Sequence, residues 1–99
     1  MTTRISRSSG NVFRDLGFPA EEAGNLRLRA DLMIQLTKLI QKRGLTQAKA
    51  ARLMGVTQPR VSNLTRGKIY SFSIDTLVEM LGRAGVRVSL LLKTSKRVA

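Results

Sequence analysis

The sequence predicts a single, mainly α-helical domain with one β-strand near its C-terminal end. Its 99 residues are enough for one hydrophobic core, and 42% hydrophobic against 24% charged residues is an ordinary globular balance. Apolar residues recur with helical spacing through the middle of the chain, and glycines follow the segments where helices would end. From residue 86 the spacing changes to the alternation that is typical of a strand. We therefore expect about five helices followed by one strand.

The ends of the chain differ from its middle. Residues 1–10, MTTRISRSSG, have no apolar period, so we expect a flexible N-terminal arm there. The domain is expected over 11–93, with a basic tail over 94–99.

A long helix is expected from about residue 19 or 20 to Lys42. Pro19 suits a first helical position, and Glu21 and Glu22 favour a helix start because they face its positive dipole end. Gly24 weakens the helix and could break it. One apolar face then follows at helical spacing, made of Leu32, Met33, Leu36, Leu39 and Ile40, and Gly44 ends the segment.

Three shorter helices follow, and each begins after a residue whose hydroxyl can cap a helix. Thr46 precedes a helix over 47–54 that ends at Gly55, and Thr57 precedes a helix over 58–66 that ends at Gly67. Only three residues join these two, so they form a helix-turn-helix unit. Ser73 can cap a further helix from Ile74 to about Ala84, which ends at Gly85.

The charge of the chain points to a polyanionic partner. Lys and Arg number 18 against 6 Asp and Glu, which gives a net charge of +12 and a pI near 11.7. Between Lys38 and Lys68 there are eight Lys or Arg residues and no Asp or Glu. Nucleic acid is therefore the leading partner, and its binding should weaken steeply with salt.

Several other functions are disfavoured by composition. The chain has no Cys and no His, which removes disulfides, thiolate and histidine catalysis and the usual zinc ligands. Asp75 and Glu79 could form a carboxylate pair, but Asp75 suits a helix start and Glu79 can pair with Arg83. We expect no enzymatic activity, no cofactor and no metal. Without an apolar run of about 18 residues or a secretory signal, a cytoplasmic protein is expected.

The helix-turn-helix unit has the residues that such a crossing needs. Ala51 is small where the second helix crosses the first, Gly55 can adopt the positive φ of the turn, and Val61 is the buried aliphatic residue of the second helix. Residues 46–68, TQAKAARLMGVTQPRVSNLTRGK, resemble the helix-turn-helix of lambda-repressor-like (Cro-type, XRE-family) DNA-binding proteins. The resemblance implies a lambda-repressor-like helical bundle whose second short helix reads DNA.

Burial of Val61 and Leu64 turns the opposite flank of that helix outward. Amides at Gln58 and Asn63 could pair with adenine, Arg60 or Arg66 with guanine or a phosphate, and Pro59 could touch a thymine methyl. Thr57 would meet a phosphate, and the resemblance implies that Gln47 braces the recognition glutamine and touches the DNA backbone. The expected DNA-binding residues are Gln47, Lys49, Thr57, Gln58, Pro59, Arg60, Ser62, Asn63, Arg66 and Lys68.

The strand expected over 86–93 has no evident partner in a helical chain. We expect it to pair with the same strand of a second copy, which would form a homodimer through Val86, Val88, Leu90 and Leu92. The alternative is a continuation of the 74–84 helix, which Gly85 disfavours. Two recognition helices roughly 34 Å apart would then read a palindromic operator in double-stranded DNA. Arg4 and Arg7 could enter a minor groove, or their arm could simply be solvated.

The wider pattern over residues 10–93 is similar to HigA-type antitoxins, in its opening SSGNVFRDLGFPAEEA and in GKIYSFSIDTLVEMLGRAGVRVSLLL after the motif. This resemblance implies a bacterial, nucleoid-associated repressor of its own operon with a RelE/HigB-like toxin as partner, for which residues 11–24 are the candidate surface. Two alternatives stay open. One is a stand-alone or phage-derived repressor, and the other is a basic module that binds a protein or RNA.

Overall fold

The computed structural model describes residues 2–5 and 12–92 and is mainly helical, as expected. The elements follow one another along the chain as β1 (Thr2–Ile5), α1 (Val12–Asp15), α2 (Ala20–Lys42), α3 (Gln47–Met54), α4 (Gln58–Thr65), the 3-10 turn η1 (Ile69–Ser71), α5 (Ile74–Arg83) and β2 (Arg87–Leu90).

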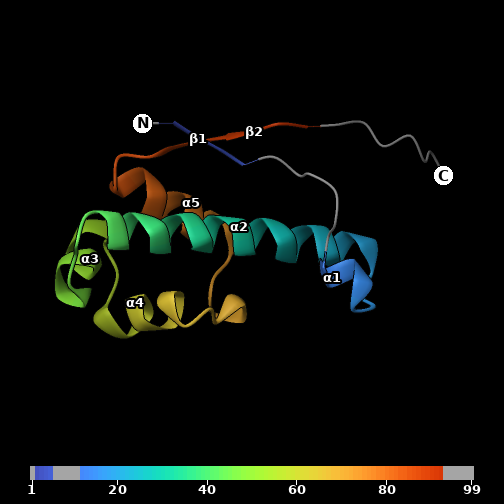
Figure 1. The fold of residues 1–99 in the computed structure, drawn as a ribbon, viewed down its shortest axis with the longest axis horizontal. Helices are drawn as coiled ribbons and strands as arrows, with labels where there is room; N and C mark the ends of the chain where they lie inside the picture. Colours follow the sequence, from blue (N-terminus) through green and yellow to red (C-terminus); the bar gives the residue numbers. More distant parts are fainter. Residues whose placement is uncertain (1, 6–11, 93–99) are drawn as a thin grey trace.

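The long helix α2 is the spine of the domain (Figure 1). It begins at Ala20, within the predicted start, with Pro19 as the N-cap rather than the first helical residue, and it runs through Gly24 without a break. The helices α3 and α4 lie on one side of it, whereas β1 and β2 lie on the other (Figure 1). The helix α2 packs against α1, α4 and α5 and against the turn η1.

The hydrophobic core lies where α2, α3, α4 and α5 meet. Each helix contributes the apolar residues that its period predicts, and Phe72 from the loop before α5 is 2% exposed. No polar or charged side chain is buried in the described part of the chain. The largest fully buried side chains are those of Leu26, Leu32, Leu36, Met54, Val61, Leu64, Phe72, Leu77, Met80 and Leu81.

Caps fix the helix ends at two of the three expected positions. The Thr46 hydroxyl accepts a hydrogen bond from the Lys49 backbone N–H at 3.1 Å, and the Ser73 hydroxyl accepts one from the Thr76 N–H at 3.2 Å. Thr57 occupies the N-cap position of α4, but its side chain makes no capping bond. The prediction of a hydroxyl cap at Thr57 is therefore wrong, although the helix starts where expected.

The C-terminal strand exists, but it is shorter than predicted, and its partner lies in its own chain. The strand β2 runs from Arg87 to Leu90 and pairs in parallel with β1, with Thr2 opposite Arg87 and Ile5 opposite Leu90. The premise that the strand had no intrachain partner is therefore wrong. The prediction of a flexible arm is also wrong for residues 2–5, which form β1. Four residues are too few for an alternating pattern to stand out in a sequence. Arg7, Lys93 and the tail 94–99 lie outside the described residues.

None of the helices within residues 12–92 combines the length and the apolar character that crossing a membrane requires.

Candidate nucleic-acid interface

The turn between α3 and α4 needs a glycine because of its backbone conformation. Gly55 has φ +70° and ψ +33°, the left-handed conformation that L-residues with a side chain rarely adopt. A Cβ on Gly55 would also lie 3.0 Å from Nε of Arg83, but the Arg83 side chain is 56% exposed and can shift. The sequence predicted the backbone conformation of Gly55. The contact with Arg83 joins two distant segments, so no local pattern could reveal it.

The two helices cross through the residues that the motif predicts. Ala51 is 6% exposed and Val61 is fully buried, and Ala50, Met54 and Leu64 complete the buried contact. Because Val61 and Leu64 fix one flank of α4 against the core, the rotation of α4 about its own axis is fixed as well. Its opposite flank must face solvent.

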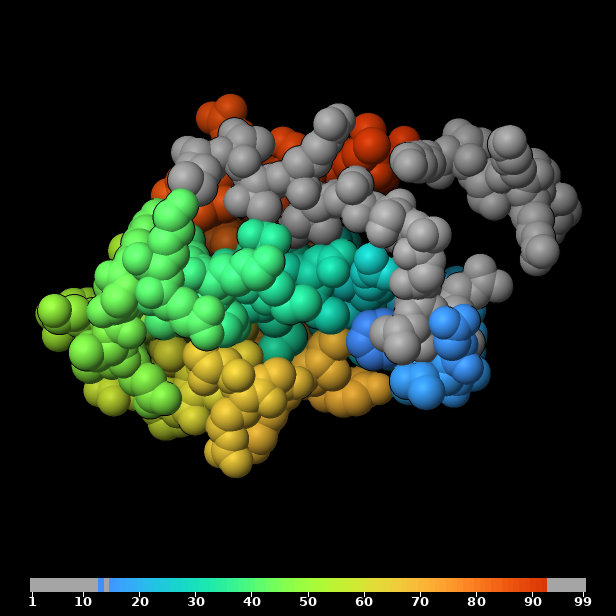
Figure 2. Space-filling model, viewed as in Figure 1, coloured from blue at the N-terminus to red at the C-terminus, as the bar shows by residue number. Residues whose placement is uncertain are grey.

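The outward flank of α4 is polar and accessible. Gln58, Pro59 and Arg66 are exposed, while Ser62 and Asn63 are half-buried. Among the described residues, no hydrogen bond engages the side-chain amide of Gln58 or Asn63. Figure 2 shows that α4 and the loop after it project at the lower edge of the molecule, away from β2. These amides are therefore available to an external partner.

Exposed cations and polar residues surround this flank. Gln47 and Lys49 at the start of α3, Thr57 before α4, and Lys68 after it are all exposed. The ion pairs of the described residues are those of Arg27 with Asp31 and Arg83 with Glu79, and the latter confirms the pair predicted for Glu79. Lys49, Arg66 and Lys68 therefore have no carboxylate partner among residues 2–5 and 12–92, and their charge can act on a bound polyanion.

Arg60, which the sequence predicts as a DNA contact, also contacts its own chain. Its Nη1 donates a hydrogen bond to the Ser71 carbonyl at 3.0 Å, and its guanidinium lies 4.7 Å from the centre of the Phe72 ring. A guanidinium that is half-buried against an aromatic face and a carbonyl stabilises the loop after α4. Arg60 therefore has a packing role, and its contact with DNA stays a prediction.

Arg29 of α2 holds the same loop from its other side, which sequence reasoning missed. Its Nη1 donates to the carbonyls of Ile69 and Phe72 at 3.3 and 3.4 Å, and its Nε donates to Oδ1 of Asn25 at 2.6 Å. Two of the many arginines thus bind backbone carbonyls of one loop. No sequence signal distinguishes them from arginines that face solvent.

Of the residues predicted for dimerisation, some are buried in their own chain and others are exposed. Val86 is 7% exposed and belongs to the core of its own chain, and Val88 packs partly against that core. Val86 therefore has little surface left for a partner, which corrects its assignment. Leu90 is 57% exposed and Leu92 is 88% exposed, and both stay candidates.

Comparison with known proteins agrees with this geometry. The profile of a family described as a helix-turn-helix domain matches residues 12–93. The chain belongs to this helix-turn-helix family. Within that class it is XRE-like, because it superimposes with a TM-score of 0.70 on a solved structure described as an XRE-family transcriptional regulator. Identity to that structure is 29%, over 79% of this chain and 90% of the other. An uncharacterized HTH-type transcriptional regulator of Haemophilus influenzae is also 29% identical, over 85% of each chain.

Proposed function

We propose that this protein is a transcriptional repressor that binds a palindromic operator in double-stranded DNA as a homodimer. The observation that carries the proposal is the fixed orientation of α4, with Val61 and Leu64 buried and Gln58 exposed on the opposite flank. An α-helix presented in this way fits the major groove, where base edges carry a distinct pattern of donors and acceptors. The role is binding rather than catalysis.

The residues around α4 divide into two kinds of contact. The amides of Gln58 and Asn63 would read adenine, with Pro59 and Ser62 beside them on the same flank. Lys49, Arg66 and Lys68 would bind phosphates, together with the Thr57 hydroxyl, which makes no capping bond. Gln47 would support Gln58 from the start of α3. Phosphate contacts position the protein, whereas base contacts set the preferred sequence.

Dimerisation would use the second edge of β2. The sheet of the described residues contains only β1 and β2, so β2 has one paired edge and one unpaired edge. Leu90, Leu91 and Leu92 at its end are more than half exposed, which is unusual for three consecutive leucines. Antiparallel pairing of β2 with its copy around a two-fold axis would cover these leucines and satisfy the edge.

The particular biological role that we propose is that of an antitoxin which represses its own operon. The support is the resemblance of residues 10–93 to HigA-type antitoxins. Co-expression with the product of the neighbouring reading frame tests this role. We expect that product to arrest growth and this protein to relieve the arrest; a harmless neighbour would favour a stand-alone repressor.

DNA recognition is tested by selecting duplexes from a random pool and measuring their affinity by fluorescence anisotropy at physiological salt. We expect the best duplex to bind at least about a thousandfold more tightly than bulk duplex. If no sequence exceeds the bulk duplex, the proposal of a specific repressor is wrong, and a non-specific basic module takes its place.

Two substitutions then separate base contacts from phosphate contacts. Gln58→Ala should cost roughly 1 to 3 kcal/mol on the selected duplex and much less on random DNA, because only the selected duplex offers the matching base edge. Lys49→Ala should weaken binding to both duplexes equally and lower the dependence on salt. Equal losses on both duplexes for Gln58→Ala would remove it from the base-reading residues.

A further inference from the structure

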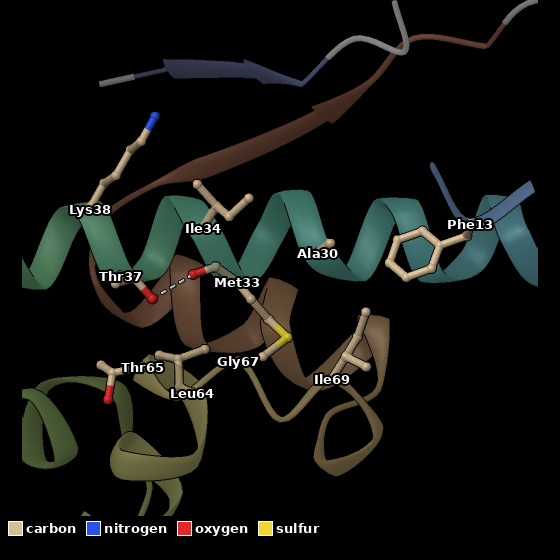
Figure 3. A pocket seen from close by; sticks show the side chains of 10 residues that line it. All are labelled: Phe13, Ala30, Met33, Ile34, Thr37, Lys38, Leu64, Thr65, Gly67 and Ile69. Atoms are coloured by element: carbon tan, nitrogen blue, oxygen red, sulfur yellow. Dashed lines mark hydrogen bonds between the residues drawn. The ribbon is translucent and has the colours of Figure 1, made fainter. Parts of the chain in front are cut away.

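An apolar groove runs between α2 and the C-terminal end of α4, on the face shown in Figure 3. Its volume is ≈ 440 Å³, which lies within the range of sites that bind ligands or peptide side chains. Met33 points from α2 toward the loop after α4, and Leu64 points from α4 toward α2 (Figure 3). The apolar lining is made by Phe13, Ala30, Met33, Ile34, Leu64 and Ile69.

The groove is already formed in the free chain. Ile69, at one side, is held by the hydrogen bond from Arg29 Nη1 to its carbonyl, and Leu64 is 1% exposed. The hydroxyl of Thr37 donates to the Met33 carbonyl at 2.9 Å, which satisfies it within α2. A partner would therefore meet an apolar surface whose lining is already positioned, which lowers the ordering cost on this side of the complex.

The charged residue that lines the groove is a cation, and no carboxylate lines it. Lys38 of α2 lines one side and is exposed, and Gly67, which lines the other, stands between the exposed Arg66 and Lys68. No carboxylate within the described residues pairs with any of these three cations, since Asp31 of α2 is paired with Arg27 at 3.4 Å. An apolar groove lined by a lysine, with two more exposed cations next to Gly67 in the sequence, is complementary to an apolar strip that has carboxylates beside it.

We propose that this groove binds an acidic amphipathic helix of a partner protein. Apolar side chains of that helix would cover Ile34, which is 49% exposed, and its carboxylates would pair with Lys38, Arg66 and Lys68. A groove bounded by two helices suits a helix presenting apolar residues at intervals of three and four. The proposed function assigns Arg66 and Lys68 to DNA, and the next step rests on that proposed function. Because the same two cations cannot bind both partners at once, the acidic helix and the operator exclude each other. Such a partner would release the repressor from DNA.

The test uses the full chain and a fluorescent synthetic peptide with leucines along one helical face and glutamates elsewhere. The control peptide has the same composition in scrambled order. We expect the amphipathic peptide to bind at least ~10-fold more tightly than the scrambled one. Equal affinities would mean that a basic protein merely attracts acidic peptides, and would overturn the groove. If the protein binds dodecanoate but not the amphipathic peptide, the proposal of a helix-binding groove is wrong, and the groove binds a small amphiphile.

A pair of substitutions locates the binding site. Ile34→Glu places a carboxylate in the groove and should weaken the amphipathic peptide by ~10-fold or more, through lost apolar contact and like-charge repulsion. Val78→Glu is the matched control, since Val78 of α5 is also exposed, at 37%, but does not line the groove. Circular dichroism checks that both variants fold. If both variants bind the peptide as well as the unchanged protein does, the site lies elsewhere and the proposal is wrong.

Competition with the selected operator duplex tests the exclusion. We expect the peptide to displace labelled duplex, and the scrambled peptide to do so only at concentrations ~10-fold higher. A ternary complex of protein, peptide and duplex would overturn mutual exclusion. Peptide binding in the groove without any sequence-specific DNA binding would instead contradict the proposed function and leave the groove intact, so the two failures are distinguishable.

Discussion

The helix-turn-helix unit and the C-terminal strand differ in how much of their apolar surface is buried within the chain. Along α3 and α4, the buried residues are all apolar and at most 6% exposed, and the polar residues are exposed except for the half-buried Arg60, Ser62 and Asn63. Along β2 and the two residues after it, only Val88 is partly covered, and Leu90, Leu91 and Leu92 are largely exposed. The first region is therefore complete within one chain. The second has the composition of an interface and lacks a second surface.

The largest expected effect comes from breaking the completed region. Val61→Asp places a carboxylate among the apolar residues of the core, and should cost ~3 kcal/mol or more of unfolding free energy. Urea unfolding followed by circular dichroism at one fixed protein concentration measures this loss. Val78→Asp, at an exposed position of α5, should cost less than ~1 kcal/mol. Similar losses of unfolding free energy for the two variants would show that Val61 is not buried in the core.

A smaller effect is expected from the region that lacks its second surface. Leu90→Lys introduces a charge twice at a two-fold interface, and should weaken the dimer by ~2 kcal/mol or more, about thirtyfold in dissociation constant. Analytical ultracentrifugation should show a shift toward monomer. Leu16→Lys is the control, because Leu16 is 70% exposed and lies far along the chain from β2. If Leu90→Lys sediments as the unchanged protein does, the interface is elsewhere.

The smallest effects distinguish the helix caps from one another. Thr46→Ala and Ser73→Ala each remove an observed capping bond and should cost ~1 kcal/mol of stability. Thr57→Ala removes no such bond, so stability should hardly change, while affinity for any duplex should fall if the hydroxyl meets a phosphate. Urea unfolding and anisotropy measure the two quantities separately. If Thr57→Ala lowers stability as much as Thr46→Ala does, the Thr57 hydroxyl caps α4 in solution.

The sequence predicted the features that depend on short-range signals. Thr46, Gly55 and Gly67 mark helix ends within a few residues of themselves, so α3 and α4 were found almost to the residue. The outward flank of α4 followed from Val61 and Leu64 through helical geometry alone.

Features that join separate segments could not be predicted in this way. The role of Arg60 depends on Phe72 and Ser71, which reach it only after the loop has folded back. The burial of Val86 and the formation of β1 likewise depend on contacts between distant segments. Local sequence patterns do not reveal such contacts.

The pairing of β1 with β2 has a consequence for how the chain is made. Thr2 lies opposite Arg87, so the sheet joins segments from opposite ends of the sequence and closes a loop around nearly the whole domain. During synthesis β1 is made before the helices, and it has no partner until β2, which follows all of them, has been made. The helices can assemble meanwhile, because their contacts are local, and the sheet should be the last structure to form.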